Sequence, residues 1–162
     1  MTHAAGRSTF PNASEKPHRD LKARALRYLA RREHSREELA RKLAPHAESA
    51  EILEGLLGEL EGKKLLSNHR FAEMRAHVLS RKYGAERIRQ DLKAKGVPGE
   101  IVARVSDAGD LERARAILKK KYREPAATRE EHARRAHFLQ SRGFSYDTIR
   151  SALSGSTNFT DE

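Results

Sequence analysis

The residues that most often perform chemistry in proteins are poorly spaced for it in this sequence. The eight histidines lie at positions 3, 18, 34, 46, 69, 77, 132 and 137, and no two have the HxxxH spacing of a helical metal site. His132 and His137 would point about 140° apart around a helix. Cysteine is absent, which excludes thiolate ligands, thiol nucleophiles and disulfides together. We therefore predict no metal site.

Nucleotide chemistry and acid–base catalysis also lack their usual signatures. The chain contains neither a GxxxxGK[ST] loop nor a GxGxxG turn, the two common glycine-rich cradles for phosphate groups. Paired carboxylates occur at Glu37-Glu38, Glu130-Glu131 and Asp161-Glu162. The first two pairs stand near expected helix starts, where negative charge favours the helix dipole. We predict no catalytic residue, no cofactor and no enzymatic activity.

The basic residues are more informative. The chain has 33 Lys and Arg against 23 Asp and Glu, with a formal net charge of +10 and a pI of about 10.1. This charge favours a polyanionic partner, either nucleic acid or an acidic protein surface. The competing interpretation is a basic surface that only keeps the protein in solution.

Two runs carry six of these cations each, RKYGAERIRQDLKAK from Arg81 and LERARAILKKKYR from Leu111, whereas EILEGLLGELEG is acidic and aliphatic. With Ile88 and Leu92 turned inward, we expect Arg89 and Lys93 together on the outer face of a helix. A solvated face with extended side chains is the alternative. The candidate residues for binding nucleic acid or a protein filament are Arg81, Lys82, Arg87, Arg89, Lys93, Lys95, Arg113, Lys119, Lys120, Lys121, Arg123 and Arg142.

Helices must position these side chains. From Asp20 onward apolar residues recur every three or four positions, for example at Leu21, Ala25 and Leu29. No segment alternates apolar and polar residues long enough to indicate a sheet, so we predict an all-α fold. Hydrophobic residues make up 37% of the chain and charged residues 35%, with a mean hydropathy of -0.82, which argues against one large core.

Nothing in the sequence indicates a membrane. No apolar run approaches the roughly 20 residues that a membrane span needs, and the N-terminus has no signal-peptide core. The first 18 residues mix Pro, Gly, Ser and His without periodicity. We expect a cytoplasmic protein with flexible tails at residues 1–18 and 155–162 and no membrane contact.

One ten-residue pattern occurs three times, as HSREELARKL, YGAERIRQDL and FSYDTIRSAL. Each copy has a ring, then a residue suited to begin a helix, then aliphatic residues five and nine positions after the ring. A ring before the helix and an aliphatic residue in its second turn form a hydrophobic staple, which sets the angle between two helices. The residues of this motif are His34, Ser35 and Leu39 in the first copy, Tyr83, Gly84 and Ile88 in the second, and Phe144, Ser145 and Ile149 in the third.

The first copy has the most complete helix start. Ser35 is expected to cap the helix through its hydroxyl, and Glu38 to complete a capping box. The copies begin 49 and then 61 residues apart, and we attribute the longer interval to a polar loop around REPAATREEH. We predict helical repeats at residues 19–66, 67–109 and 110–154. Such units stack to bury their apolar faces, so we expect an elongated, monomeric tandem array.

The segments YLARREHSREEL, LLSNHRFAE, YGAERIRQDLKAKGV and HFLQSRGFSYDTI, in this order, resemble the RecX family, the bacterial regulators of the RecA recombinase. The likeness runs from about Leu21 to Leu153. Its most specific pieces are Phe71-Ala72, Tyr83-Gly84, Lys95-Gly96 and the run from Arg142 to Ser145. The chain departs from the family at Ser67-Asn68-His69, where an acidic residue is usual, and at His34, where an aromatic ring is usual.

The resemblance implies a non-enzymatic protein of tandem three-helix units that lies in the helical groove of the RecA–DNA filament. Such a protein limits filament growth, ATP hydrolysis and strand exchange. Weak, sequence-independent DNA binding is expected to accompany the RecA contact. Two other classes stay open. One is a stand-alone nucleic-acid-binding protein, because short helix pairs with a tight turn are typical of helix-turn-helix domains. The other is a helical adaptor for another protein.

Overall fold

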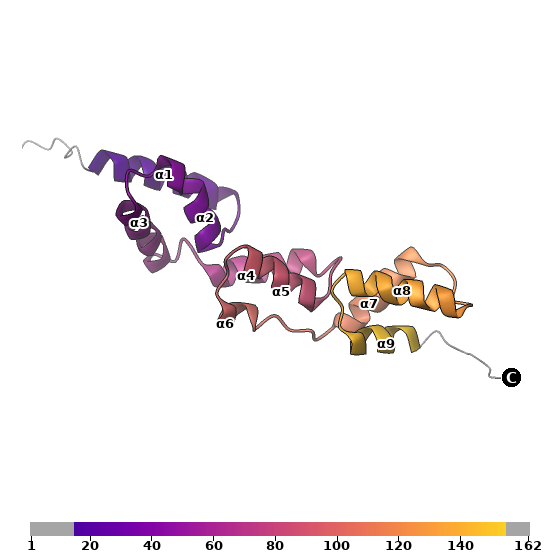
Figure 1. Ribbon diagram of the computed structural model, residues 1–162. Coiled ribbons are helices and arrows are strands. Elements are labelled where there is room, and N and C mark those ends of the chain that lie inside the picture. Colours follow the sequence, from indigo (N-terminus) through magenta and orange to yellow (C-terminus); the bar gives the residue numbers. More distant parts are fainter. Residues whose placement is uncertain (1–14, 155–162) are drawn as a thin grey trace, which may run out of the picture. The chain divides into compact units, whose positions relative to one another are not determined.

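The computed structural model describes residues 15–154, most of which are helical (Figure 1). No strand occurs within this range, and the predicted all-α fold is confirmed. In chain order the elements are α1 (Glu15–Arg31), α2 (Arg36–Leu43), the 3-10 helix η1 (Ala44–His46), α3 (Ala50–Gly62), α4 (Asn68–Leu79), α5 (Ala85–Ala94), α6 (Gly99–Val102), α7 (Asp110–Lys121), α8 (Arg129–Ser141) and α9 (Tyr146–Ser154). The expected tails lie outside the described residues, except that residues 15–18 begin α1.

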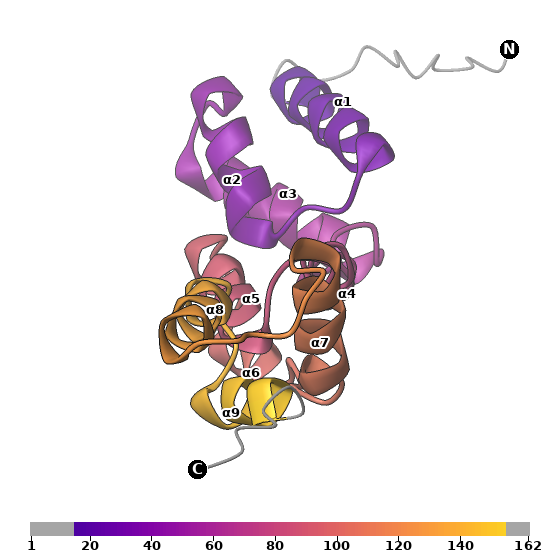
Figure 2. The same cartoon turned by 90° about the vertical axis from the view of Figure 1, so that its right-hand side faces the viewer.

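The chain divides into two compact units, residues 1–67 and 68–162. Among the described residues the first unit holds α1, α2 and α3, and the second unit holds α4 to α9. In the second unit α4 packs on α5 and α6, while α7 and α8 both pack on α9 (Figure 2). The implied three-helix domains are therefore α1–α3, α4–α6 and α7–α9. Their predicted limits at 19–66, 67–109 and 110–154 stay predictions.

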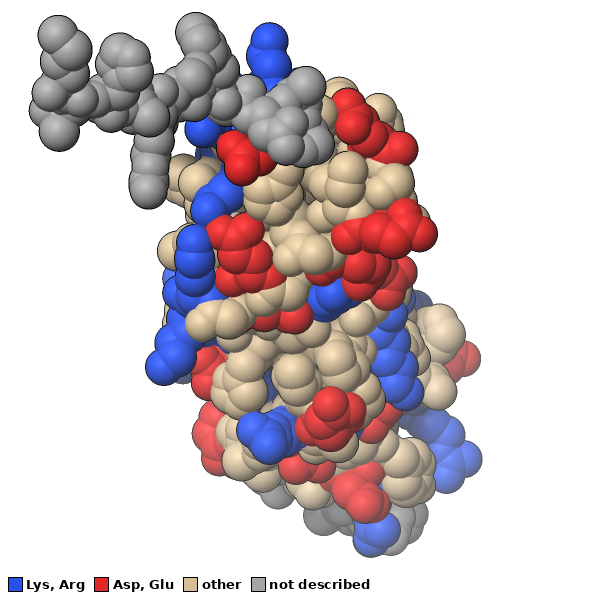
Figure 3. Space-filling view, turned by 90° about the vertical axis from the view of Figure 1, so that its left-hand side faces the viewer, with Lys and Arg blue, Asp and Glu red and all other residues tan. Residues whose placement is uncertain are grey.

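Most of the charged residues lie on the surface, and the apolar residues are shared among three small cores. Figure 3 shows one face, on which Lys and Arg lie beside Asp and Glu in several places. Each three-helix domain has its own cluster of buried apolar side chains. This division explains how a chain with 37% hydrophobic residues can fold without one large core.

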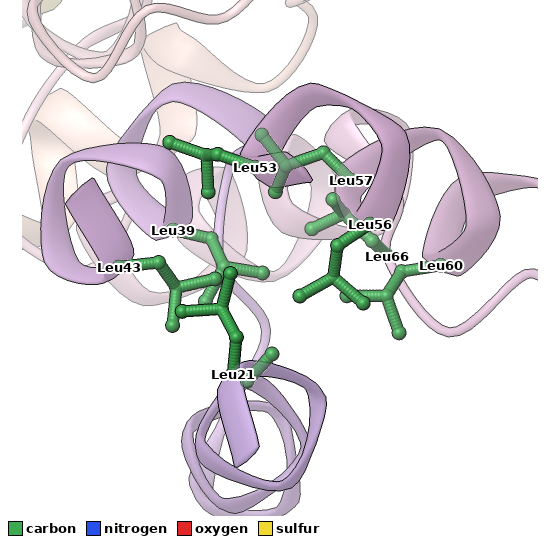
Figure 4. Close-up of a cluster of buried hydrophobic side chains, with 9 residues drawn as sticks. Leu21, Leu39, Leu43, Leu53, Leu56, Leu57, Leu60 and Leu66 are labelled. Atoms are coloured by element: carbon green, nitrogen blue, oxygen red, sulfur yellow. The ribbon is translucent and has the colours of Figure 1, made fainter. Parts of the chain in front are cut away.

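The first core consists mainly of leucines (Figure 4). Leucines of α2 and α3 lie against one another, and Leu21 reaches them from α1. Burying one such side chain contributes about 1.5–3 kcal/mol. Five of the leucines are completely buried: Leu39, Leu43, Leu56, Leu57 and Leu60.

The other two cores include the rings of the repeated pattern. Tyr83 packs beside the cluster that holds Ile88, and Phe144 and Ile149 belong to the third cluster. Not every apolar residue with helical spacing is buried, since Val78 is 51% exposed. Val78 stands two helical turns after Phe71, on the same face of α4. Periodicity predicts this face, but it does not predict which turns of the helix pack against a neighbouring element.

The interval between the second and third copies of the pattern contains an additional helix. The first two copies follow α1 and α4, the first helices of their domains, whereas the third follows α8, the second helix of its domain. The attribution of the longer interval to a polar loop was therefore wrong. Helix α7 occupies it, and α8 already begins at Arg129, where the Thr128 hydroxyl accepts a hydrogen bond of 3.1 Å from the Glu131 amide.

Serine caps begin two of the repeated helices. The Ser35 hydroxyl accepts a bond of 3.0 Å from the Glu38 amide, and the Ser145 hydroxyl accepts one of 3.2 Å from the Thr148 amide. The predicted cap at Ser35 is confirmed. In the second copy Gly84 is the N-cap and has no side chain to donate or accept, so the first turn of α5 needs other acceptors.

Candidate protein and nucleic-acid interface

The missing cap of α5 is supplied by the third domain. The Gly84 amide donates to the Arg142 carbonyl at 2.9 Å, and the Glu86 amide donates to the Gly143 carbonyl at 3.2 Å. The turn before α5 and the turn before α9 are the second and third copies of the same motif. They lie back to back and join the two domains of the second unit.

Two glycines make this close approach possible. A Cβ atom on Gly84 would lie 2.5 Å from the Gly143 carbonyl oxygen. A Cβ atom on Gly143 would lie 2.4 Å from the Cβ of Arg87, and Gly143 also has a φ of +81°. Both distances are too short for any side chain, so the joint requires glycine at each position.

Asp110 completes the joint from the start of α7. Its Oδ2 atom accepts a hydrogen bond of 3.0 Å from the Ala85 amide, and its Oδ1 atom accepts one from the Arg113 guanidinium. Asp110 is 2% exposed. A buried carboxylate is tolerated when it is fully bonded and lies at a helix N-terminus, and Asp110 meets both conditions at the start of α5.

Arg142 and Arg87 lie on aromatic rings beside this joint. The Arg142 guanidinium lies 5.5 Å from the centroid of the Tyr83 ring and 5.1 Å from that of Phe138, and it donates to the Lys82 carbonyl at 3.4 Å. The Arg87 guanidinium lies 5.8 Å from the Tyr83 ring centroid. Cation–π contacts of this kind contribute about 0.5–1 kcal/mol. These two candidate residues therefore also stabilise the domain.

The expected outward pair on α5 was half wrong. Lys93 is exposed as predicted, but Arg89 is half-buried and donates to the Val105 carbonyl at 2.6 Å and to Glu86 at 2.8 Å. Arg89 therefore fastens the segment after α6 to α5. Arg89 does lie opposite the buried residues of α5, as the spacing of apolar residues predicts. The chain after α6, however, passes over this side of α5 and covers part of Arg89.

The candidate cations divide into an exposed group and a half-buried group. Arg89, Lys95, Arg113 and Arg142 are the half-buried ones. Lys121 is exposed, but its Nζ lies 4.2 Å from the Phe138 ring centroid. The exposed members are Arg81, Lys82, Arg87, Lys93, Lys119, Lys120, Lys121 and Arg123.

The motif of the first domain contains a buried histidine. His34 is 1% exposed, and its Nδ1 lies 3.0 Å from the Arg32 carbonyl oxygen while its Nε2 lies 2.9 Å from Lys42 Nζ. A carbonyl only accepts and an ammonium only donates, so Nδ1 carries the proton and Nε2 accepts. Burial lowers the pKa of His34 below its ordinary value of 6.5, and the nearby charges of Arg32 and Lys42 lower it further.

Glu38 is the acidic partner in this region. The Arg32 guanidinium donates two hydrogen bonds, of 2.6 and 3.0 Å, to its carboxylate. These bonds lower the pKa of Glu38 to about 2. The Arg32 side chain thus links the end of α1 to the start of α2, in addition to the Ser35 cap.

The first domain is not acidic throughout, although the segment EILEGLLGELEG is. Helix α3 carries four glutamates and no Lys or Arg, but α1 carries six Lys and Arg, of which Lys16, Arg19, Arg27 and Arg31 are exposed. The run LKARALRYLAR in α1 was the available signal. Its cations add to the candidate surface of the first unit.

Neither a metal cluster nor a membrane span is found in the described part of the chain. Between residues 15 and 154, no group of three or more His, Asp or Glu residues could hold a metal ion. No helix in the same range is long and apolar enough to cross a membrane. The candidate binding residues on the described surface are therefore the exposed Lys and Arg side chains of the two joined domains.

Comparison with known proteins places these domains. Models of the first, second and third three-helix domains of RecX match residues 22–60, 67–105 and 108–153. The chain belongs to the RecX family. RecX proteins are regulatory and non-enzymatic, so the family assignment agrees with the prediction that this chain is not an enzyme. The specific motif pieces, from Phe71-Ala72 to Phe144-Ser145, lie inside the matched domains.

Curated relatives cover most of the chain. It is 44% identical over 144 residues to the regulatory protein RecX of Leptothrix cholodnii, a match that spans 87% of this chain and 92% of the relative. It is 45% identical over 141 residues to that of Herbaspirillum seropedicae, with 85% and 92% covered. The RecX of Neisseria meningitidis is 42% identical over 140 residues, with the same coverage.

Solved RecX structures share the fold. A crystal structure of RecX from Lactobacillus salivarius superposes with a TM-score of 0.78 at 20% identity, over 87% of this chain and 97% of that one. A second crystal structure of a regulatory protein RecX gives 0.75 at 20% identity, over 93% and 82%. The three-helix RecX domains thus persist at low sequence identity.

Proposed function

We propose that this chain regulates the RecA recombinase, mainly as an inhibitor, by lying in the helical groove of the RecA–DNA filament. In this position it limits filament growth, ATP hydrolysis and strand exchange. The observation that carries the proposal is the joint between the second and third domains. The glycine contact and the Asp110 bond hold two domains together as one body, and both domains carry exposed cations.

A preassembled two-domain surface suits a repetitive partner. A filament offers the same acidic features at regular intervals, and a joined pair of domains can contact more than one of them without first ordering a linker. The exposed cations of this surface include Lys82, Lys93 and Lys119. We propose that they meet phosphate or acidic protein groups of the filament, and that the chain acts in the cytoplasm as a monomer.

DNA contact alone is expected to be weak. Phosphate contacts through Lys and Arg carry no sequence information, and we see no set of Asn, Gln and Arg side chains arranged to read base edges. The rival interpretation as a stand-alone nucleic-acid-binding protein requires tight, sequence-selective binding without RecA. A helical adaptor for another protein would instead bind its partner in high salt, with little regard for DNA.

The decisive experiment adds the protein to RecA assembled on single-stranded DNA. ATP hydrolysis and filament length, the latter by electron microscopy, should both decrease with increasing amounts of the chain. The same titration with DNA but no RecA measures direct binding. Unchanged hydrolysis and unchanged filament length, with sequence-selective DNA binding, would support the nucleic-acid-binding protein instead.

A further inference from the structure

One face of α4 forms the wall of a groove in the second unit. A cavity of about 380 Å³ lies along it. Ala72 and Ala76 of α4 line it, together with Ser80 directly after the helix. Ala72 and Ala76 are four residues apart and therefore share one face of the helix. The opposite wall comes from Ile101 and Val105. By helical rise, α4 alone gives this groove a length of about 16 Å.

The groove continues past α4 onto α7. A second cavity, of about 390 Å³, shares Ser80 and Arg113 with the first and adds Arg81, Ile117 and Lys120 to the lining. Since the two cavities share Ser80 and Arg113, they adjoin one another, and together they make up a hollowed surface that extends from α4 to α7. We call it the α4–α7 groove.

Its floor and its rim differ in chemistry. The floor is made of small and aliphatic side chains such as Ala76, Ile101 and Ile117. The rim carries the basic side chains His69, His77, Arg81, Arg104, Arg113 and Lys120, and Glu73 is the only acidic residue in the lining of either cavity.

One polar atom of a lining residue lacks a hydrogen-bond partner. The Nε atom of Arg113 is buried and has no hydrogen-bond acceptor within the described part of the chain. The other guanidinium nitrogens of Arg113 bond to Asp110 and to the Ala108 carbonyl, the latter at 3.4 Å. A buried donor without an acceptor is costly. The Nε atom itself is shielded from solvent, but the Arg113 side chain is 29% exposed, so its positive charge can attract a carboxylate in the groove.

The floor makes nucleic acid the less suitable occupant. Single-stranded nucleic acid gains affinity in grooves by stacking its bases on aromatic side chains, and the lining of both cavities contains no Phe, Tyr or Trp. An aliphatic floor instead gains free energy by removing an apolar side chain from water. A basic rim around it favours acidic residues on either side of that apolar group.

We propose that the α4–α7 groove binds an acidic peptide segment of a partner protein, with an aliphatic or aromatic side chain of the segment seated beside Ala76. In the context of the proposed function, on which this identification of the partner rests, the segment belongs to RecA. The recognition is of the kind in which a groove holds apolar anchors and charged flanks select the partner. In this proposal three of the candidate cations attract the acidic residues of the segment: Arg81, Arg113 and Lys120.

A peptide titration tests the groove without RecA. The probe is a fluorescein-labelled synthetic peptide of Glu, Leu and Phe, and its binding to the full chain is followed by anisotropy. Ala76→Trp, which fills the groove, should weaken binding by about tenfold or more, whereas Ala133→Trp on the exposed side of α8 should not. Replacing each Glu of the peptide by Lys should abolish binding. Equal affinity for the unaltered chain and Ala76→Trp would overturn the proposal, as would indifference to the sign of charge.

A second variant tests the proposal in case Ala76→Trp does not fold. Arg81→Glu combined with Lys120→Glu reverses two exposed rim charges and should also weaken the acidic peptide by about tenfold. Circular dichroism checks that each variant keeps its helical signal. If the double variant is folded and still binds the acidic peptide fully, the rim does not select the ligand and the proposal fails.

Photocrosslinking separates the groove from the proposed function. A benzophenone amino acid in place of the exposed His77, at the edge of the groove, leaves the floor beside Ala76 open and should crosslink to RecA on single-stranded DNA. Crosslinking only to DNA, or to a second copy of the chain, would overturn the groove assignment. If Ala76→Trp still inhibits RecA fully, the proposal that RecA binds in this groove is overturned, while the proposed function is unaffected. If the peptide binds the groove but the unaltered chain leaves RecA unaffected, the groove stands as an acidic-peptide site and RecA regulation fails.

Discussion

The Oδ2 atom of Asp110 accepts a hydrogen bond of 3.0 Å from the backbone amide of Ala85. Asp110 is the first residue of α7, and Ala85 is the first residue of α5. A side chain of the third domain thus caps a helix of the second. This long-range cap explains why the second copy of the repeated pattern can have Gly84 where the first has Ser35, and it ties the two domains into one folding unit.

Asp110→Ala should destabilise the second unit by about 1–3 kcal/mol, because it leaves the buried Ala85 amide and the Arg113 guanidinium without their acceptor. Urea denaturation followed by circular dichroism measures the loss. The exposed Asp107→Ala, three residues earlier, should change the free energy of unfolding by less than about 0.5 kcal/mol. Equal midpoints for both variants would show that the cap contributes nothing.

Gly143→Ala should destabilise the same joint by about 1–3 kcal/mol or more, because it combines a positive φ with a Cβ 2.4 Å from that of Arg87. Gly58→Ala is the opposite case. Gly58 lies inside α3 and its added Cβ meets nothing within 4 Å, so this change should stabilise the first unit by about 0.5–1 kcal/mol. Thermal melts rank the two. A neutral Gly143→Ala would contradict the close packing of the two turns.

Mild acid should weaken the first unit through His34. The folded state lowers the pKa of His34 below 6.5, so the unfolded chain binds the proton more readily as the pH falls. The free energy of unfolding should therefore decrease below about pH 6.5. His34→Phe removes the titration but keeps a ring. Between about pH 7.5 and about pH 5.5, its melting temperature should fall less than that of the unaltered chain.

Glu38 separates this effect from stronger acid. Because the pKa of Glu38 is lowered to about 2 by Arg32, its contribution is present above the ordinary value of 4.5 and is lost as the pH falls from there toward 2. The contribution of Glu38 to stability is present both in the unaltered chain and in His34→Phe. A His34→Phe variant with the same pH dependence as the parent above pH 4.5 would rule out His34 as the titrating group.

Reversing three exposed cations should abolish inhibition of RecA while leaving the fold intact. The changes are Lys93→Glu, Lys119→Glu and Lys120→Glu, at positions where substitutions usually alter stability by under about 0.5 kcal/mol each. RecA ATPase on single-stranded DNA is the measurement. Arg89 is left out, because its bond to the Val105 carbonyl makes Arg89→Glu a structural change as well.

The matched control reverses the same amount of charge elsewhere in the second unit. Arg129, Arg134 and Arg150 are exposed and lie outside the candidate set. Their triple change to Glu should retain most of the inhibition. Equal loss in both variants would mean that net charge, rather than the position of the cations, governs the effect.

DNA binding in the absence of RecA should be weak, should depend little on sequence and should fade steeply as salt rises. Each phosphate neutralised by Lys or Arg releases counterions, so the logarithm of the binding constant falls linearly with the logarithm of salt concentration. Anisotropy with two unrelated single-stranded oligonucleotides measures both properties. Binding confined to one sequence at physiological salt would instead favour the stand-alone nucleic-acid-binding function.

The sequence by itself determined the helices, the repeats and the family. These depend on local rules: apolar residues every three or four positions, a ring five residues before an aliphatic one, and a serine at a helix start. Ser35, Phe144 and Ile149 could be placed because each acts on its own helix or on the adjacent one. The RecX motif pieces are likewise contiguous stretches of sequence, so they could be recognised without any knowledge of the tertiary contacts.

Only the tertiary structure decided which cations are exposed and how the domains join. Arg89 has the helical position of an outward residue, but the segment after α6 passes over it. In the sequence, Asp110 is an acidic residue in the first turn of its own helix. In the structure its carboxylate accepts a hydrogen bond from the Ala85 amide, 25 residues earlier. Contacts of this kind join residues far apart in the chain, and no local period encodes them. For the same reason the α4–α7 groove, whose two walls are not adjacent in sequence, could be found only in the folded protein.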